Sequence, residues 1–352
     1  MKNLRYRIKD IAQLAKVSVG TVDRVIHNRG EVSAESRRKV EETIAKVGYK
    51  PSIFSSSYAG LKSYKLVIVL PQHHEGEYWD LCEQGIKKAL FELSKIKIEV
   101  NFFLYNQFDP VHCDEIFALA FIESADAYLI GPVFQEETKR FANKLTENNI
   151  PYVFIDNMVE SSEPMAFFGM ESYSCGIIQA RMLINCMLPG TDIAVMSYLL
   201  TNDNSYIENV SKKNGFISHF QSCLPQTKIL YSYCFTENEE ESWRLMDHFF
   251  LENVNIGGVV VFNSRAHIVA SYFKMKGNRN IRIVGCGAIP NNIAWLKDGY
   301  IDFLIAERPE YQGYMGIRAI LEFFSRKIKP KVNNFTPIDI LVKESADFYN
   351  SF

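Results

Sequence analysis

The sequence predicts a small all-α head followed by a larger α/β body, built as two successive subdomains with doubly wound parallel sheets. Three observations support this prediction. Residues 8–27 hold two short helical periodicities separated by a break. From residue 64 onward, apolar runs alternate with helical stretches, and the alternation occurs twice. Basic residues are also concentrated near the N-terminus, as on a separate domain.

The N-terminal periodicity predicts a helix-turn-helix. Apolar residues recur at helical spacing through residues 8–15, the pattern breaks over 16–18, and it resumes over 19–27. Ser18 stands where its hydroxyl can accept a first-turn N–H group of the second helix. An ordinary helical hairpin has the same spacing, so the periodicity alone does not decide between the two.

A third helix is expected over residues 34–47. Ser33 is its predicted N-cap, and Glu35 lies in the first turn, where the helix dipole favours an acid. Val40, Ile44 and Val47 form one apolar face. This face can pack across the first two helices and close a three-helix head.

The charge distribution suggests a nucleic-acid partner for the head. Residues 1–62 hold 13 Lys and Arg against 6 Asp and Glu, whereas the remainder holds 26 against 35. Phosphate contacts need Lys and Arg. A solvated basic surface is the alternative interpretation.

The body shows strand and helix patterns in alternation. Strands buried on both faces and separated by helices indicate parallel sheets, and two such sets predict two subdomains with a cleft between them. The helix at 311–324 should cross back to the first subdomain. The expected helices before it cover residues 78–93, 112–122 and 135–148. The expected strands cover residues 65–70, 102–105, 127–130 and 152–155, then 193–196, 229–231, 259–262, 281–284 and 303–305.

Composition excludes several classes of protein. The chain has 352 residues, 47% of them hydrophobic, but no apolar run of 18 residues, so we expect no membrane span. The first ten residues lack the apolar centre of a secretory signal, and we expect a cytoplasmic protein. Its seven cysteines are scattered, which argues against a disulfide framework and a zinc cluster. We expect no metal and no cofactor.

A specific motif covers the head. Residues 10–25 read D-I-A-x-x-A-x-V-S-x-x-T-V-x-R-V, followed by V-S-A-E-S-R-x-K-V and G-Y-K-P. This run resembles the head of the LacI/GalR family of bacterial transcriptional regulators. The resemblance implies a helix-turn-helix, a hinge helix, and a periplasmic-binding-protein-like core that senses a small effector and forms a homodimer. Paired heads imply a near-palindromic operator.

The resemblance also implies domain boundaries. We expect the head at residues 1–50, the hinge at 51–62 and the core at 63–352. The expected N-subdomain covers about 63–160 and 308–330, and the expected C-subdomain about 161–307 and 331–352.

In the family, the second helix enters the major groove of the operator. Val19 and Gly20 occupy positions that usually carry operator-reading side chains, yet neither can offer a side-chain hydrogen bond. Asp23 departs from the usual Ser and could accept from a cytosine or pair with a neighbouring Arg. The full predicted DNA-binding set is Arg7, Ser18, Val19, Gly20, Thr21, Asp23, Arg24, His27, Arg29 and Tyr58.

Tyr58 matches the position of a Leu that family members insert into the minor groove. Ser55, Ser56 and Ser57 before it are poor helix formers, so a flexible linker is expected in the free protein. On operator DNA, we expect a helix.

Ligands of open parallel sheets bind beyond the carboxyl ends of the strands. Tyr78 and Trp79 follow the first strand and could stack on a sugar ring, although core packing is the alternative for Trp79. His73 and His74 lack the further ligands that a metal site needs. Asp156, at the end of the fourth strand, could bind hydroxyl groups.

Matches to the family's effector positions depart from the usual residues. Lys212 replaces an Arg, Asn263 is kept but Arg265 is introduced nearby, and Glu307 stands where Gln is frequent. Residues 285–288 lack the usual carboxylate. These changes predict a less acidic pocket and a carbohydrate-derived effector that can include an anionic group such as a uronate or phosphate.

Two other functions stay open. The first is a regulator with a purine-like corepressor, which would strengthen DNA binding. The second is a sugar-modifying enzyme on the same core. It is disfavoured because no G-x-G-x-x-G, G-K-[ST] or G-x-S-x-G motif follows any strand. We expect a regulator rather than an enzyme.

Overall fold

A computed structural model describes residues 8–26, 32–47, 63–93, 98–198, 210–236 and 238–349. The chain divides into two compact units, Met1–Leu61 and Lys62–Phe352. The first unit is called the head here, and the second the core.

The head contains the three expected helices, α1 (Ile8–Ala15), α2 (Val19–Ile26) and α3 (Ala34–Val47). Its centre is apolar, and Ile11, Val22 and Val40 are fully buried there. The two predicted caps are confirmed. Ser18 Oγ accepts from the Thr21 N–H at 3.1 Å, and Ser33 Oγ accepts from the Ser36 N–H at 3.3 Å.

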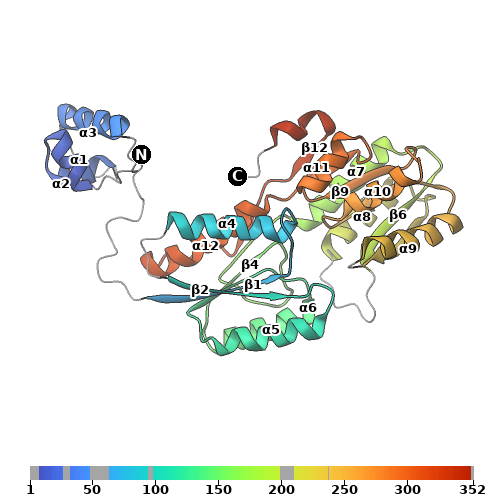
Figure 1. Ribbon diagram of the computed structural model, residues 1–352, viewed down its shortest axis with the longest axis horizontal. Helices are drawn as coiled ribbons and strands as arrows, with labels where there is room; N and C mark the ends of the chain where they lie inside the picture. Colours follow the sequence, from blue (N-terminus) through green and yellow to red (C-terminus); the bar gives the residue numbers. More distant parts are fainter. Residues whose placement is uncertain are drawn as a thin grey trace. The chain divides into compact units, whose positions relative to one another are not determined.

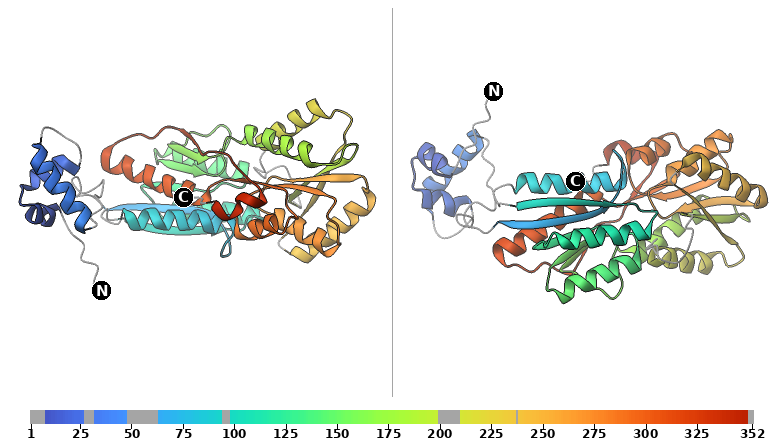
Figure 2. Two further views of the ribbon diagram at one scale, coloured as in Figure 1. Left: turned by 90° about the horizontal axis from the view of Figure 1, so that it is seen from above. Right: turned by 60° about the horizontal axis from the view of Figure 1, so that its bottom comes forward.

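The first subdomain of the core is a parallel six-stranded sheet in the order β11-β5-β4-β3-β1-β2. Helices α4 (Tyr78–Glu92) and α12 (Pro309–Arg326) cover one face, and α5 (Pro110–Ile122) and α6 (Gln135–Glu147) cover the other (Figures 1 and 2). The strands are β1 (Tyr64–Pro71), β2 (Ile98–Tyr105), β3 (Ala127–Ile130), β4 (Tyr152–Ile155), β5 (Ala166–Gly169) and β11 (Asn333–Phe335).

The second subdomain repeats this plan in the order β12-β10-β9-β8-β6-β7, with β12 antiparallel to β10. A short 3₁₀ helix, Lys343–Phe348, follows the last strand. The strands are β6 (Asp192–Tyr198), β7 (Ile229–Phe235), β8 (Ile256–Val261), β9 (Arg282–Cys286), β10 (Phe303–Ala306) and β12 (Asp339–Leu341). The helices are α7 (Ser172–Cys186), α8 (Val210–Cys223), α9 (Glu239–Glu252), α10 (Ala266–Met275) and α11 (Pro290–Lys297).

The continuous apolar runs reflect sheets that are buried on both faces. In β6, Ile193 and Val195 pack in one apolar cluster with Phe216 of α8. Ala194 and Met196, which alternate with them, belong to a second cluster formed with residues of α9, α10 and α11. Successive strand residues point to opposite faces, so both sets of positions must be apolar.

The described chain passes between the two sheets at three crossover segments, residues 170–171, 307–308 and 336–338. Strands β5 and β11 therefore belong to the first sheet. The expected change of subdomain at residues 160–161 and 330–331 is wrong, because each of these short strands precedes a crossover rather than following it.

Two glycines bring α7 and α8 into close contact. A Cβ on Gly176 would lie 1.8 Å from the carbonyl oxygen of Lys212, and a Cβ on Gly215 would lie 2.1 Å from that of Tyr173. Only a residue without a side chain permits this approach. The backbone of Lys212 is thereby fixed against α7.

The seven cysteines are free thiols, as expected, and five of them are buried. Within the described residues, no helix combines the length and the apolar character needed to span a bilayer.

Candidate DNA-binding head and effector pocket

The exposed face of α2 carries the predicted operator-reading positions. Val19, Gly20 and Arg24 are exposed, whereas Val22 and Val25 point into the head. The Thr21 hydroxyl lies 2.9 Å from Ser18 Oγ, so the cap also engages this predicted DNA contact. The polar side chain that α2 presents most openly among these positions is Arg24.

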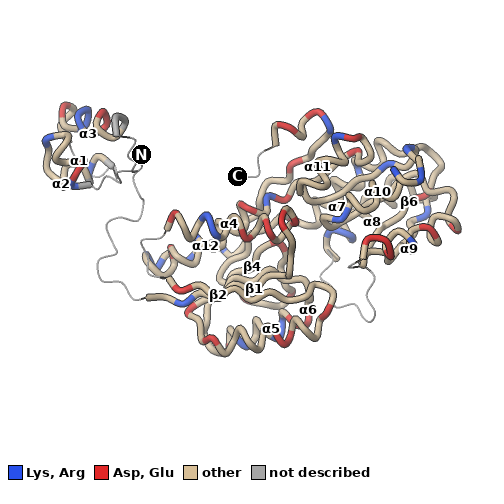
Figure 3. Tube along the Cα trace, in the orientation of Figure 1, with Lys and Arg blue, Asp and Glu red and all other residues tan. Residues whose placement is uncertain are grey.

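Basic residues on α3 are paired with acidic ones a turn away. Arg37 faces Glu41 at 3.9 Å, and Lys39 donates to Glu35 at 2.6 Å. Figure 3 shows the two signs of charge side by side along this helix. The positive charge of the described head therefore acts mainly through exposed residues of α1, α2 and the turn between them, namely Lys9, Lys16 and Arg24.

Several predicted DNA contacts lie outside the described residues. They are Arg7, His27, Arg29, Tyr58, the hinge at 51–62 and the side chain of Asp23.

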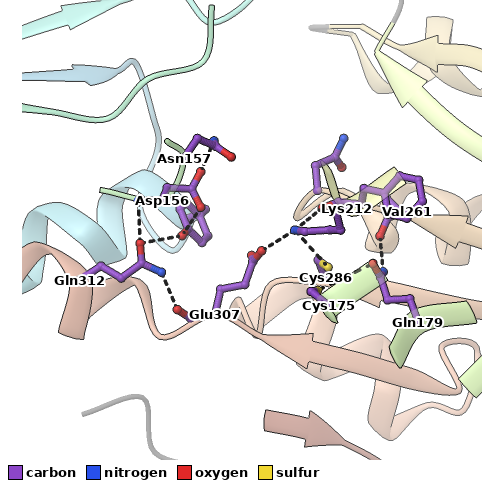
Figure 4. A network of polar contacts seen from close by, with 12 residues as sticks. Asp156, Asn157, Cys175, Gln179, Lys212, Val261, Cys286, Glu307 and Gln312 are labelled. Carbon is purple, nitrogen blue, oxygen red and sulfur yellow. Dashed lines mark hydrogen bonds and ion pairs between the residues drawn. The ribbon is translucent and has the colours of Figure 1, made fainter. Parts of the chain in front are cut away.

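A narrow polar pocket lies at the crossover segments of the core. Figure 4 shows its polar side chains approaching from both subdomains, with Glu307 between them. The lining residues are Asp156, Met170, Ser172, Lys212, Glu307 and Gln312.

Lys212 is buried and fully engaged by the protein. Its ammonium group donates to Glu307 Oε1 at 2.9 Å and to the Phe262 carbonyl at 3.1 Å, and it lies 3.7 Å from Cys286 Sγ. Burial opposes the charged form, but Cys286 and Glu307 outweigh this effect and hold the pKa of Lys212 well above its usual value. Lys212 therefore keeps its positive charge across the physiological pH range.

Asp156 follows β4 on the first-subdomain side of the pocket. Its carboxylate accepts from the Tyr78 hydroxyl at 2.7 Å and from Asn157 Nδ2 at 2.8 Å. Burial, followed by the negative charge of Glu307, raises the pKa of Asp156 to about 7. The residue has a φ of 72°, a left-handed conformation that is uncommon outside Gly, Asn and Asp.

Gln312 joins the two halves of this arrangement. Its Oε1 accepts from the Asp156 N–H at 2.8 Å, and its Nε2 donates to the Glu307 carbonyl at 2.6 Å. Sequence reasoning missed Gln312, although its position in the first turn of the crossing helix α12 could have suggested it.

Behind Lys212, two buried thiols meet. Cys175 of α7 and Cys286 of β9 share a hydrogen bond, which lowers the pKa of Cys175. Both belong to an apolar cluster with Met170 and Ile305. This cluster fills the space between the crossover segments.

The loop after β8 is held in place by hydrogen bonds and by a ring contact. Asn263 Oδ1 accepts from the Arg265 N–H at 3.0 Å, and the Arg265 guanidinium lies 5.1 Å from the centre of the Phe108 ring. Phe108 comes from the first subdomain. Asn292 Nδ2 donates to the Ser264 carbonyl at 3.0 Å and to Gly287 at 2.8 Å, which fixes this loop to the one after β9.

Trp79 lies in the core of the first subdomain. A Cβ on Gly131 would lie 2.3 Å from its ring, and Trp79 is 6% exposed. Its burial favours core packing over stacking on a sugar. Tyr78 stands edge-on to this ring and directs its hydroxyl to Asp156.

The structure thus brings together Asp156, Lys212 and Glu307, with Tyr78 adjacent. Trp79, Asn263 and Arg265 are not among the residues that line the described pocket. In this cluster Glu307 neutralises Lys212, and a second carboxyl group, Asp156, lines the same pocket. The expectation of a pocket less acidic than a neutral-sugar site stays a prediction. Among the described residues, no group of three or more His, Cys, Asp or Glu side chains is placed to hold a metal ion.

Two family models match the chain. Residues 7–52 match the bacterial regulatory proteins of the lacI family, and residues 66–327 match a periplasmic binding protein domain. Catabolite control protein A of Staphylococcus aureus (strain MRSA252) is 26% identical over 147 residues, which is 42% of each chain. The regulator RegA of Clostridium acetobutylicum is 41% identical over 64 residues, 18% of this chain and 19% of RegA. The matched segments span less than half the length of these relatives.

Solved structures resemble the core. A structure described as a LacI transcriptional regulator, from Bacteroides fragilis, aligns with a TM-score of 0.77 at 29% identity, covering 82% of this chain and all of that one. A glucose-galactose binding protein from Geobacillus stearothermophilus aligns with a TM-score of 0.67 at 19% identity, over 81% of this chain and 99% of its own; this likeness shows the fold. The core of the chain belongs to the periplasmic binding protein domain family, and its N-terminal head matches the bacterial regulatory proteins of the lacI family.

Proposed function

We propose that the protein is a sequence-specific DNA-binding transcriptional regulator whose operator affinity is controlled by a small carbohydrate-type effector. One observation carries the proposal: a capped helix-turn-helix with an exposed reading face is joined, in one chain, to a two-sheet core with a polar pocket at its crossover segments. The helix serves DNA recognition, and the pocket serves a small polar ligand.

The proposed regulator is a homodimer that binds a near-palindromic operator. Two copies related by a two-fold axis present two identical reading helices, so the half-sites mirror the symmetry of the protein. Because it acts on chromosomal DNA, we place it in the cytoplasm.

The control mechanism follows from the position of the pocket. Its lining comes from both subdomains, so a ligand there favours one relative orientation of the two. A difference in affinity between the two orientations of about 1–3 kcal/mol is enough to change operator binding 5- to 150-fold. We expect the effector to release DNA.

Selection of binding sites from random duplex DNA with the full chain tests the first part of the proposal. We expect an enriched site with two inverted half-sites, and binding that weakens steeply with salt. Enrichment of no sequence would contradict DNA-specific regulation. An effector that strengthens binding would favour the corepressor alternative instead.

Arg24→Ala tests the reading face on the selected site. Loss of a base contact by Arg costs about 1–3 kcal/mol, so we expect specific binding to weaken about 5- to 150-fold. Arg38→Ala on α3 is the matched control, because Arg38 is exposed and faces Glu42 at 3.8 Å. Equal losses in the two variants would exclude Arg24 from base reading.

A further inference from the structure

The pocket is lined by more carboxyl groups than ammonium groups. The pocket contains one ammonium group, on Lys212, and two carboxyl groups, on Asp156 and Glu307. Lys212 and Glu307 form an ion pair at 2.9 Å, so their charges cancel. What remains is the carboxyl group of Asp156.

The Lys212 ammonium has no capacity left for an anionic ligand. An ammonium group has three N–H donors, and three protein groups surround it, namely Glu307, the Phe262 carbonyl and Cys286. A carboxylate or phosphate on a ligand would have to displace the buried Glu307, which would leave that carboxylate unpaired at high cost.

Asp156 is differently placed. Its contacts with Tyr78 and Asn157 come from neutral donors, and an ionised carboxylate has about four acceptor sites. It lies deep in the core but keeps accessible surface and lines the pocket. Figure 4 shows it across the pocket from Lys212, beside Gln312. A cation entering the pocket would meet this carboxylate.

We propose that the effector carries a protonated amino group that binds Asp156, as an amino sugar or a related amino polyol does. This inference rests on the proposed role of the pocket as the effector site, and it specifies the chemical class of the ligand. The amino group neutralises the carboxylate that Lys212 leaves unpaired and relieves its repulsion with Glu307. Ser172 also lines the pocket, and its hydroxyl suits a hydroxyl group of the ligand.

The test uses the full chain without DNA. Calorimetric titration compares matched sets of amine, neutral and carboxylate sugars: glucosamine with glucose and glucuronate, galactosamine with galactose and galacturonate, and mannosamine with mannose and mannuronate. Within the set that binds most tightly, we expect the amine to bind about tenfold more tightly than the neutral sugar. A tenfold difference in affinity corresponds to the free energy of a shift of one pKa unit. Equal or tighter binding of the neutral sugar or the carboxylate, or no binding by any of the nine, overturns the proposal.

Asp156→Asn identifies the group. Asn adopts the left-handed conformation as readily as Asp and has the same shape, so the variant should fold. We expect it to lose the preference for the amine, whereas Asp298→Asn, a change at an exposed residue paired with Lys274, should keep it. An unchanged preference in Asp156→Asn overturns the assignment.

The pH dependence gives a second readout. An amine binds the ionised carboxyl group, so its affinity should rise about tenfold per pH unit as pH increases from about 5 towards 7, while the amine stays protonated. Asp156→Asn should abolish this rise, and its persistence there would overturn the assignment. The other titratable groups that interact with Asp156 are Tyr78 and Cys82 of α4, Glu307 of the crossover, Lys212 of α8 and Tyr105 of β2.

The titration also separates this inference from the proposed function, because it involves no DNA. A chain that binds amino sugars but selects no DNA sequence contradicts regulation alone. A chain that binds its operator but prefers neutral sugars contradicts the amine alone.

Discussion

The buried ion pair between Lys212 and Glu307 makes single substitutions costly. Lys212→Met leaves the Glu307 carboxylate buried without a cation, so we expect the free energy of unfolding of the core to fall by about 3–5 kcal/mol. Urea denaturation followed by circular dichroism measures this change. The double variant Lys212→Met with Glu307→Gln removes both charges and should recover more than half of the loss. A double variant as unstable as the single one would show that the cost is not electrostatic.

Asp156 makes the stability of the core depend on pH. Its pKa is about 7 in the folded chain, against an ordinary value of 3.8. Between these values the folded state holds the proton more tightly than the unfolded state, so stability decreases as pH rises from about 4 to 7. The total effect is about 4 kcal/mol. We expect the unfolding free energy of the wild type to fall relative to that of Asp156→Asn as pH rises across this range. Parallel curves would contradict the raised pKa.

Ser18 sets the start of the reading helix α2. Because its hydroxyl accepts from the Thr21 N–H, Ser18→Ala should cost the head about 1 kcal/mol. Ser18→Gly is the matched control, since Gly at this position costs only a few tenths of a kcal/mol. Thermal unfolding of the full chain gives the midpoint temperature at which the head unfolds. This temperature should be highest for the wild type, lower for Ser18→Gly and lowest for Ser18→Ala. A Gly variant less stable than the Ala variant would exclude the capping explanation.

Contact between α7 and α8 depends on Gly176. An Ala there would bring its Cβ to 1.8 Å from the Lys212 carbonyl, so the helices must separate. Overpacking of this kind costs about 1–3 kcal/mol. We expect Gly176→Ala to lower the unfolding free energy of the core and to weaken effector binding, because Lys212 moves with α8. Arg181→Ala, at an exposed position of α7, should do neither.

Nine strands of the core were predictable from the sequence, and the three strands beside the crossovers were not. The nine expected strands of the core are all present, because each contains a continuous apolar run. Strands β11 and β12 have only three residues, and Asn333–Phe335 carries two Asn, so no apolar run reveals them. Strand β5 is apolar and buried but was missed. The place of these three strands beside the crossovers is decided by tertiary contacts.

Part of the pocket was predictable for a similar reason. Asp156 and Glu307 follow strands, and the ends of parallel strands meet at one edge of a sheet. The pairing of Lys212 with Glu307 was not predictable, because the two are separated by 95 residues and meet only once α7 and α8 have packed. The sequence therefore did not reveal that the charge of Lys212 is neutralised within the protein.

The two compact units of the chain suggest separable roles. Removal of residues 1–61 should leave a core that keeps effector binding and loses operator binding, since the pocket is formed entirely by residues 156–312. Titration of the truncated chain with the tightest-binding sugar, beside the full chain, measures this. A more than tenfold loss of sugar affinity would show that the head contributes to the pocket.

The strand β1 also determines how the core resists a mechanical force that is transmitted through the N-terminal segment. The chain enters the core at Tyr64, and β1 is not an edge strand: it pairs with β2 along Tyr64–Pro71 and with β3 along Leu66–Val69. Tension applied along β1 through the N-terminal segment loads both hydrogen-bonded ladders in shear, so many bonds must break together rather than one after another. The core is thus mechanically anchored at the point where the DNA-binding unit is attached.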